Sequence, residues 1–244
     1  MKRALLILLF APPLHAAGHV QKSPDFLMGS VVKSDKWKMD RTNNLETFTG
    51  NVLFRNPRYT LKADNAIYNR GTSVWDLNGS VYTLRSFEDL SRVEVKCDSA
   101  RYLEAGEVAY LARGALPVRM KYLGADGRVL SGLSDRARAD SLSGLMHFTG
   151  AFSLATENLD LYSERSLYDN AQDTFLLYYS TTAPAAATGD LPAAIGRREG
   201  YDFAIAAESI KFFKDSRDIK FYNRVSGWAK DTPSPAAVGV PEKH

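Results

Sequence analysis

Six acidic residues recur along the chain in the same local setting, and they are the first candidates for chemistry. Each is the second residue of a six-residue pattern: a small residue, an acid, any residue, an apolar or small residue, any residue, and an apolar residue. The six acids are Asp35, Asp64, Asp98, Asp135, Glu164 and Glu208. Carboxylates can transfer protons or bind metal ions, but an acid that recurs in every unit has a structural role. We expect each to lie exposed at a corner of a sheet and to accept local backbone hydrogen bonds.

The remaining residue types give little support for catalysis. Of the four histidines only His19 and His147 lie away from the chain ends, too few for a metal cluster or a convincing triad. His147 adjoins Phe148 in a strand-like run, so we expect an exposed strand histidine. Cys97 is the only cysteine, which excludes an internal disulfide. There is no glycine-rich phosphate loop and no basic cluster of the kind that binds nucleic acid. We therefore expect no enzyme, cofactor, metal or nucleic-acid partner.

The acids belong to repeated pairs of short runs. A turn follows most of the patterns, and the second run then carries a glycine with an apolar residue two positions later. These pairs are Gly50/Val52, Gly79/Val81, Gly114/Leu116 and Gly150/Phe152. Polar turns between alternating runs predict hairpins. The sequence thus predicts about six stacked hairpins.

Alternation within the second runs assigns their residues to faces. Nine apolar residues share the expected inner face: Phe48, Val52, Phe54, Trp75, Leu77, Val81, Phe148, Phe152 and Leu154. Gly79 falls on the same face by this count. One apolar and one polar face is typical of half-buried antiparallel strands. In the first runs the apolar positions change face after the acid, which predicts a bulge or a sheet corner there.

The ends of the chain differ from the repeats. Residues 1–17 combine Lys2 and Arg3 with an apolar run and small residues at 16 and 17, as in a cleavable signal peptide. The alternative is a retained membrane anchor. Cleavage would remove two of the 31 basic residues, so that 29 basic residues would face 28 acidic ones. Such a balance does not predict an anionic partner.

Composition sets the expected domain boundaries. We expect one β domain over residues 18–229, interrupted by a long Ala/Pro-rich loop at 180–200. A Pro-rich tail at 230–244 is expected to be disordered.

Several segments together resemble the OstA-like family of lipopolysaccharide transport proteins, which includes LptA, LptC and the amino-terminal domain of LptD. They are SDKWKMDRTNNLETFTGNVLF (34–54), LKADNAIYN (61–69) with LNGSVYT (77–83), and VEVKCDSARYLEAGEVAYLARG (93–114). The resemblance implies an all-β fold, a twisted antiparallel β-jelly roll with an apolar interior open along one side. It further implies that lipid A acyl chains lie in that interior. It also implies that end strands pair with other jelly-roll transport proteins or with a second copy of the chain. The insertion at 180–200 departs from the simplest family pattern, which leaves open whether the last hairpin joins the same interior.

Our hypothesis from the sequence is a periplasmic, non-enzymatic carrier or bridge that binds lipopolysaccharide, with membrane association possible through its partners. The nine inner-face residues are its candidate lipid-binding residues, although each would serve equally well in an ordinary packed core. Two rivals remain: a membrane-anchored, LptC-like subunit, and a structural β-repeat protein with a closed core that uses its edges for assembly. A well-formed polar pocket around His147 would revive an enzyme.

Overall fold

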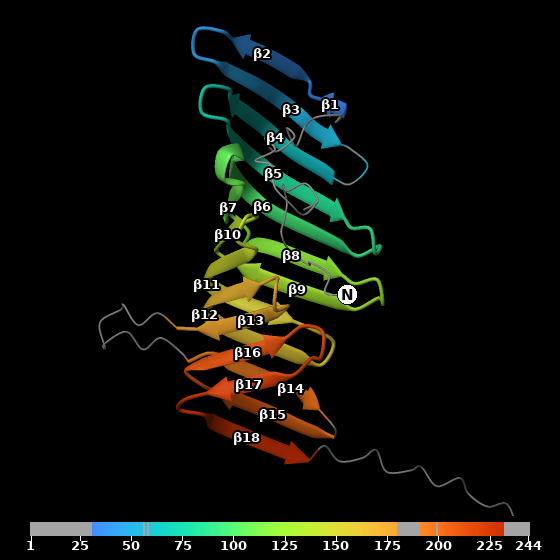
Figure 1. Ribbon diagram of the computed structural model, residues 1–244, viewed down its shortest axis with the longest axis vertical. Helices are drawn as coiled ribbons and strands as arrows, with labels where there is room; N and C mark the ends of the chain where they lie inside the picture. The colour runs from blue at the N-terminus through green and yellow to red at the C-terminus, as the bar shows by residue number, and fades with distance from the viewer. Residues whose placement is uncertain (1–30, 56, 58, 180–190, 199, 232–244) are drawn as a thin grey trace, which may run out of the picture.

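The computed structural model describes residues 31–55, 57, 59–179, 191–198 and 200–231, and these residues are almost entirely β-structure. They form eighteen strands in which every pairing is antiparallel, with one short 3-10 helix at Glu104–Gly106 (Figure 1). The expected all-β, antiparallel jelly-roll class is confirmed.

The long strands are bent in the middle, and most short strands extend the sheet on one side of the bend only. The strands are β1 (Val31–Lys33), β2 (Lys36–Asp40), β3 (Leu45–Arg55), β4 (Tyr59–Asn69), β5 (Val74–Ser86), β6 (Arg92–Leu103), β7 (Val108–Ala112), β8 (Val118–Leu123), β9 (Val129–Ser134), β10 (Arg136–Asp140), β11 (Leu145–Ala155), β12 (Leu159–Asp169), β13 (Thr174–Tyr178), β14 (Ala193–Arg198), β15 (Tyr201–Ala206), β16 (Ser209–Phe213), β17 (Ile219–Tyr222) and β18 (Ser226–Asp231).

The pairings divide the strands into two layers that run the length of the molecule. Layer I has the order β2-β3-β4-β5-β6-β7-β10-β11-β12-β13-β16-β17. Layer II has the order β1-β3-β4-β5-β6-β8-β9-β11-β12-β14-β15-β18. The bent strands β3, β4, β5, β6, β11 and β12 belong to both layers. The result is an elongated stack with the N-terminal strands at one end and β17 and β18 at the other (Figure 1).

The two layers face each other across one apolar core. Phe48 and Trp75 in layer I meet Phe54 in layer II, with ring centroids 5.6 and 5.3 Å apart in edge-to-face geometry. The ring centroids of Phe148 in layer I and Phe152 in layer II lie 4.9 Å apart. Such contacts combine buried apolar area with favourable ring geometry, so they hold the layers together.

Each bend is built from a glycine and an acid. Gly50, Gly79 and Gly150 have φ values of +75°, +75° and +76°, and each is followed by another residue of positive φ. A Cβ at Gly79 would lie 2.8 Å from both Cβ and Cγ of Asp64, which leaves room only for glycine. Gly79 therefore marks the bend and not the inner face that the alternation indicated.

The acids occupy these bends as expected, but the hydrogen bonds seen at three of them do not come from the local backbone donors that we expected, and Asp98, Asp135 and Glu208 are half-buried and not exposed. Asp35 and Asp135 accept side-chain hydrogen bonds, from Asn51 at 2.9 Å and from Arg113 at 2.5 Å. Asp98 accepts a backbone hydrogen bond from Leu116 at 3.3 Å. A change of register marks the bend in the pairings of β3, β5 and β11. The extra residue lies in the glycine-bearing strand, opposite the acid-bearing strand in which we expected the irregularity.

All six predicted hairpins are present as β2–β3, β4–β5, β6–β7, β10–β11, β12–β13 and β16–β17. The last of them stacks on β13 through β16, so it joins the same interior as the others.

Two expected boundaries need correction. Residues 193–198 form β14, which pairs with β12 and β15, whereas we expected loop throughout 180–200. The reason is that Ala194 is fully buried against the core, so an alanine-rich segment serves as a close-packed strand. Likewise, residues 230 and 231 belong to β18 and not to the expected tail. The expected signal peptide at 1–17, residues 180–190 of the loop and the tail from 232 on lie outside the described residues.

Candidate functional site

The nine candidate lipid-binding residues come together in the core between the layers. Layer I contributes Phe48, Trp75, Leu77 and Phe148, and layer II contributes Val52, Phe54, Val81, Phe152 and Leu154. All nine are buried, and none is more than 7% exposed. Their shared inner face is confirmed, whereas their contact with lipid stays a prediction.

A cavity of about 1020 Å³ opens at the N-terminal end of the stack. We call it the N-terminal cavity. Three of the nine candidates, Phe48, Phe54 and Trp75, line it together with Val32 and Trp37. Val32 and Trp37 are aligned with inner-face residues of β3, yet they are 43% and 58% exposed because no strand lies beyond β1 and β2 among the described residues. Within the part of the chain that the structure describes, the apolar interior is therefore open at this end.

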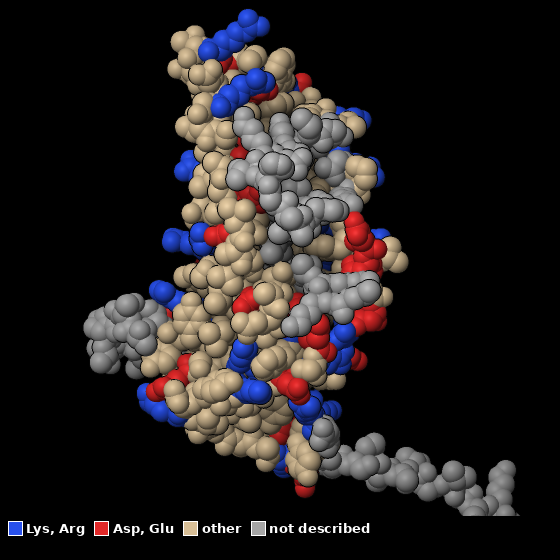
Figure 2. Space-filling model, viewed as in Figure 1, with Lys and Arg blue, Asp and Glu red and all other residues tan. Residues whose placement is uncertain are grey.

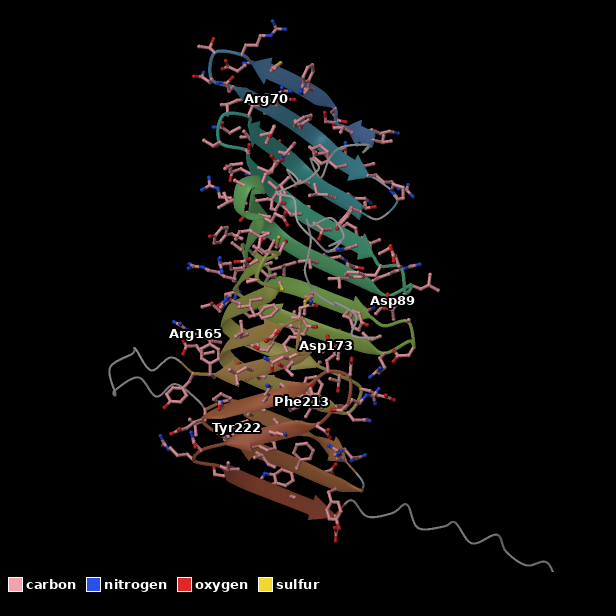
Figure 3. All side chains as sticks on the ribbon, in the orientation of Figure 1. Arg70, Asp89, Arg165, Asp173, Phe213 and Tyr222 are labelled. Atoms are coloured by element: carbon pink, nitrogen blue, oxygen red, sulfur yellow. The ribbon has the colours of Figure 1, made fainter. Side chains whose placement is uncertain are left out.

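Two glutamates orient the aromatic rings beside the N-terminal cavity. Glu46 is buried, accepts a hydrogen bond from Trp37 Nε1 at 3.1 Å and pairs with Arg70. Glu104 accepts hydrogen bonds from Trp75 Nε1 at 2.8 Å and from the Tyr68 hydroxyl at 3.0 Å. These bonds satisfy the indole donors and hold the rings in place. In Figure 3, Arg70 lies near the N-terminal end of the stack.

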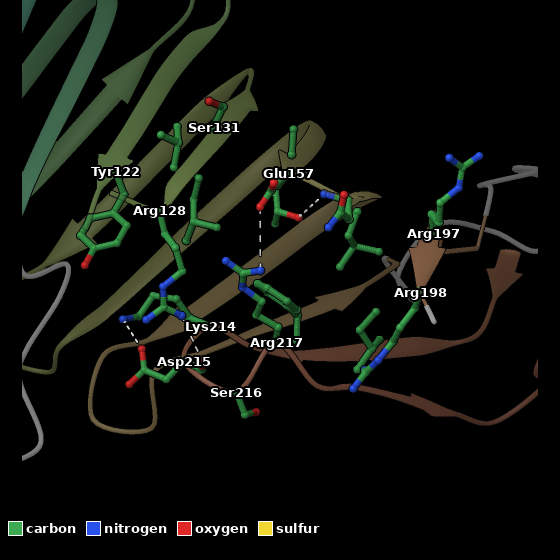
Figure 4. A pocket seen from close by; sticks show the side chains of 18 of the residues that line it. Tyr122, Arg128, Ser131, Glu157, Arg197, Arg198, Lys214, Asp215, Ser216 and Arg217 are labelled. Atoms are coloured by element: carbon green, nitrogen blue, oxygen red, sulfur yellow. Dashed lines mark hydrogen bonds and ion pairs between the residues drawn. The ribbon is translucent and has the colours of Figure 1, made fainter. Parts of the chain in front are cut away.

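A second opening of about 880 Å³ lies in the C-terminal half, which we call the C-terminal cleft. Its apolar wall contains residues from both layers: Tyr122, Leu130, Leu159, Phe203, Phe212 and Ile219. The turn of residues 214–218, between β16 and β17, closes the layer I side (Figure 4). Phe213, just before this turn, is labelled in Figure 3.

None of the nine candidates lines the C-terminal cleft. Most of its layer II wall comes from β8, β9, β14 and β15, which lie between the repeated patterns or in the expected loop. The repeats therefore predicted residues of the shared core but none of the residues that line this opening.

Charged side chains surround the mouth of the C-terminal cleft. The basic ones are Arg128, Arg197, Arg198, Lys214 and Arg217, and the acidic ones are Asp126, Glu157 and Asp215. Figure 2 shows charged side chains of both signs over the C-terminal half of the face in view. The opening thus combines an apolar wall with a polar, mainly basic mouth.

Lys214 belongs to a buried polar network at one side of this cleft. Its Nζ donates to Asp215 Oδ1 at 2.7 Å, lies 3.4 Å from Asp173 Oδ1 and stands over the Tyr122 ring. The Tyr168 hydroxyl donates to Asp173 Oδ1 at 2.8 Å. Burial raises the pKa of both Tyr122 and Tyr168, so both phenols remain protonated at neutral pH. The network fixes the start of the 214–218 turn against β12 and β13.

The described residues offer little to a catalytic mechanism. They contain no group of three His, Cys, Asp or Glu side chains placed to hold a metal ion. Burial raises the pKa of the Cys97 thiol to about 12, whereas reactive cysteines have a lowered pKa. His147 is half-buried on the outer face and not exposed as we expected, and burial lowers its pKa. It lines neither opening. Within the same residues, no helix has the length and apolar character needed to cross a membrane.

Comparisons with known proteins give a limited result. No family model matches the chain, and no relative is found among curated proteins. Among solved structures, the chain is similar to LptH of Pseudomonas aeruginosa, described as the LptA homologous periplasmic component of the conserved lipopolysaccharide transport device. The two are 11% identical, the match covers 69% of this chain and 95% of LptH, and the TM-score is 0.33. A likeness of this size does not assign a function to the chain.

Proposed function

We propose that the protein is a periplasmic, non-enzymatic carrier or bridge that binds lipopolysaccharide during its export. The observation that carries the proposal is the C-terminal cleft, where an apolar wall from both layers opens beneath a mainly basic mouth. Acyl chains have an apolar surface to occupy there, and an acidic headgroup meets arginine and lysine. Burial of a chain contributes about 0.8 kcal/mol per methylene.

The continuity of the interior supports transport along the molecule. Inner-face residues form one apolar cluster that extends from Phe48 near the N-terminal end to Phe212 near the C-terminal end. The N-terminal cavity and the C-terminal cleft open this cluster at separate levels. A lipid that enters one opening would pass along the inner face, provided that the layers separate between the two.

The edges support a bridge. Among the described residues, β1, β2, β17 and β18 each pair with one neighbouring strand. Unpaired edges are templates for strand addition. Another jelly-roll transport protein, or a second copy of this chain, could therefore extend the stack at either end.

A structural β-repeat protein with a closed core is the second candidate function. It is favoured by one observation: Val52, Leu77, Val81, Phe148, Phe152 and Leu154 are buried and line neither opening. In that case the two openings would be surface features, and the edges alone would act in assembly. The anchored, LptC-like subunit is distinguished by the mature mass, because cleavage near residue 17 removes about 2 kDa.

Photo-crosslinking in cells tests the proposal. A photoreactive amino acid at Leu130 or Ile219, in the C-terminal cleft, is expected to label lipopolysaccharide. The same substitution at Tyr110, on the outer face, is the matched control. Crosslinks at Phe48, Trp75 and Phe148 then show how far acyl chains enter the core. A folded, exported protein that gives no lipid adduct at the cleft positions would refute the carrier.

A further inference from the structure

Three arginines bridge the two layers at the mouth of the C-terminal cleft. Arg128, in the loop before β9 of layer II, donates from Nη1 to the main-chain oxygen of Asp215 in the 214–218 turn of layer I, at 3.1 Å. Its Nε also pairs with Asp126. This guanidinium is thus held at the mouth by oxygens from both layers.

The other two arginines make longer contacts across the same gap. Arg217 Nη1, on the 214–218 turn, lies 4.0 Å from Glu157 Oε2 in the loop between β11 and β12 (Figure 4). Arg198 Nη2, at the end of β14, lies 3.5 Å from Asp218 Oδ1. We call Arg128, Arg198 and Arg217 the mouth arginines. They approach one opening from three separate segments of the chain.

The bridges made by Arg198 and Arg217 are weak. The side chains of Arg198 and Asp218 are each 54% exposed, and those of Arg217 and Glu157 are 51% and 77% exposed. Exposed ion pairs contribute little to stability, because water screens both charges. A phosphate group carries more charge than a carboxylate and accepts paired hydrogen bonds from a guanidinium. It can therefore displace the carboxylates from these two arginines.

The two other basic side chains at the mouth are held differently. Arg197 makes a two-point contact with Asp202, at 2.6 and 3.2 Å, on the outer face. Lys214 is 9% exposed and lies between Asp173 and Asp215. A ligand is therefore expected to replace the present partners of the two weakly paired mouth arginines. Lys214 keeps its carboxylate partners and adds positive charge beside the mouth.

We propose that Arg128, Arg198 and Arg217 form a phosphate-binding site for the lipid whose acyl chains occupy the C-terminal cleft. In the free protein, carboxylate oxygens across the gap occupy Arg198 and Arg217, and the phosphate replaces them beside Arg128, which the Asp215 main-chain oxygen and Asp126 hold at the mouth. The replacement also releases the contacts to Glu157 and Asp218 that tie the 214–218 turn to layer II. The headgroup thereby opens the mouth that it enters. This inference rests on the proposed function, because it needs acyl chains in the cleft.

Equilibrium binding to the purified full chain tests the site. The probes are a fluorescent, diphosphorylated and acylated glucosamine disaccharide and its phosphate-free counterpart. The wild-type chain is expected to prefer the phosphorylated probe by about tenfold. Arg198→Gln combined with Arg217→Gln should abolish most of this preference and leave binding of the phosphate-free probe unchanged.

Two further variants sharpen the test. Arg101→Gln is the matched control, because Arg101 pairs with Asp76 on the exposed outer face, away from the cleft. Glu157→Gln combined with Asp218→Asn removes the competing carboxylates, so the phosphorylated probe should bind about threefold more tightly.

The outcomes separate the site from the proposed function. If the double arginine variant keeps the wild-type preference, the phosphate site is overturned while lipid binding stands. If the wild-type chain binds neither probe, the carrier itself is overturned. Inorganic pyrophosphate distinguishes a free anion from a headgroup. If it binds the wild-type chain as tightly as the phosphorylated probe does, the lipid-headgroup assignment is overturned.

Discussion

Replacement of Gly79 by alanine tests the bend that joins the two layers. Gly79 has φ +75°, a conformation that costs an alanine about 1–2 kcal/mol. The new Cβ would also lie 2.8 Å from Cβ and Cγ of Asp64 and closer still to its Oδ2, so strand β4 or the carboxylate must move. Displacement of packed groups adds about 1–3 kcal/mol. We therefore expect a loss of about 3 kcal/mol in the free energy of unfolding.

The assay is denaturant and thermal unfolding followed by circular dichroism. For a chain of this size, 3 kcal/mol corresponds to a decrease in Tm of about 6–12 °C. Gly106→Ala is the matched control, because Gly106 is not in the left-handed region and its new Cβ would meet nothing closer than 3.6 Å. Asp64→Ala should rescue Gly79→Ala only in part, since the contact with the Asp64 Cβ remains. If Gly79→Ala unfolds like Gly106→Ala, the bend does not depend on glycine and the reasoning is wrong.

Three other predictions concern the core. Ala194→Asp should destabilise the fold by about 3 kcal/mol or more, because the new carboxylate is buried in β14. Ala193→Asp, on the half-buried outer face of the same strand, should cost about 1 kcal/mol or less. Equal losses of stability in urea unfolding would argue against β14 as a core strand. Lys214→Met should cost about 3 kcal/mol, because the partly buried Asp173 carboxylate loses its positive partner and keeps only the Tyr168 hydroxyl. Lys211→Met, at a half-buried position on the outer face, should cost less than about 1 kcal/mol in the same unfolding assay. Burial raises the pKa of Cys97 in the folded protein to about 12, so the thiol contributes its full stability below the unfolded pKa near 8.5 and less as pH rises toward 12. The difference in unfolding free energy between the wild type and Cys97→Ala should therefore shrink between pH 9 and pH 11. A constant difference would refute the raised pKa of Cys97.

The repeated patterns predicted the parts of the fold that depend on local chemistry. Alternation and the turns, plainly polar in four of the six units, identified all six hairpins. The acids together with Gly50, Gly79 and Gly150 identified the bends. These features depend on residues close in sequence or directly opposite in a pair. Alternation alone assigned Gly79 to the inner face, because counting every second residue assumes an extended backbone. Gly79 instead has the left-handed conformation and lies in the bend.

The sequence could not show how the hairpins share their strands between two layers. Strands β8, β9 and β14 pair with the halves of β6, β11 and β12 that lie beyond the bends, and β15 pairs in turn with β14. No local pattern marks the long-range pairings of β8, β9 and β14. Alanine-rich β14 resembled a linker because close packing selects small residues as readily as a loop does. The C-terminal cleft follows from these strands, so its residues could not be identified from the repeats.

The most direct measurement of the central claim is a crystal structure of the protein with a glycolipid whose acyl chains carry bromine. The account predicts anomalous difference density for bromine between the layers, in the C-terminal cleft beside Leu130, Phe212 and Ile219. Bromine density confined to the outer face, or a lipid-bound protein with a closed core and an empty cleft, would contradict it.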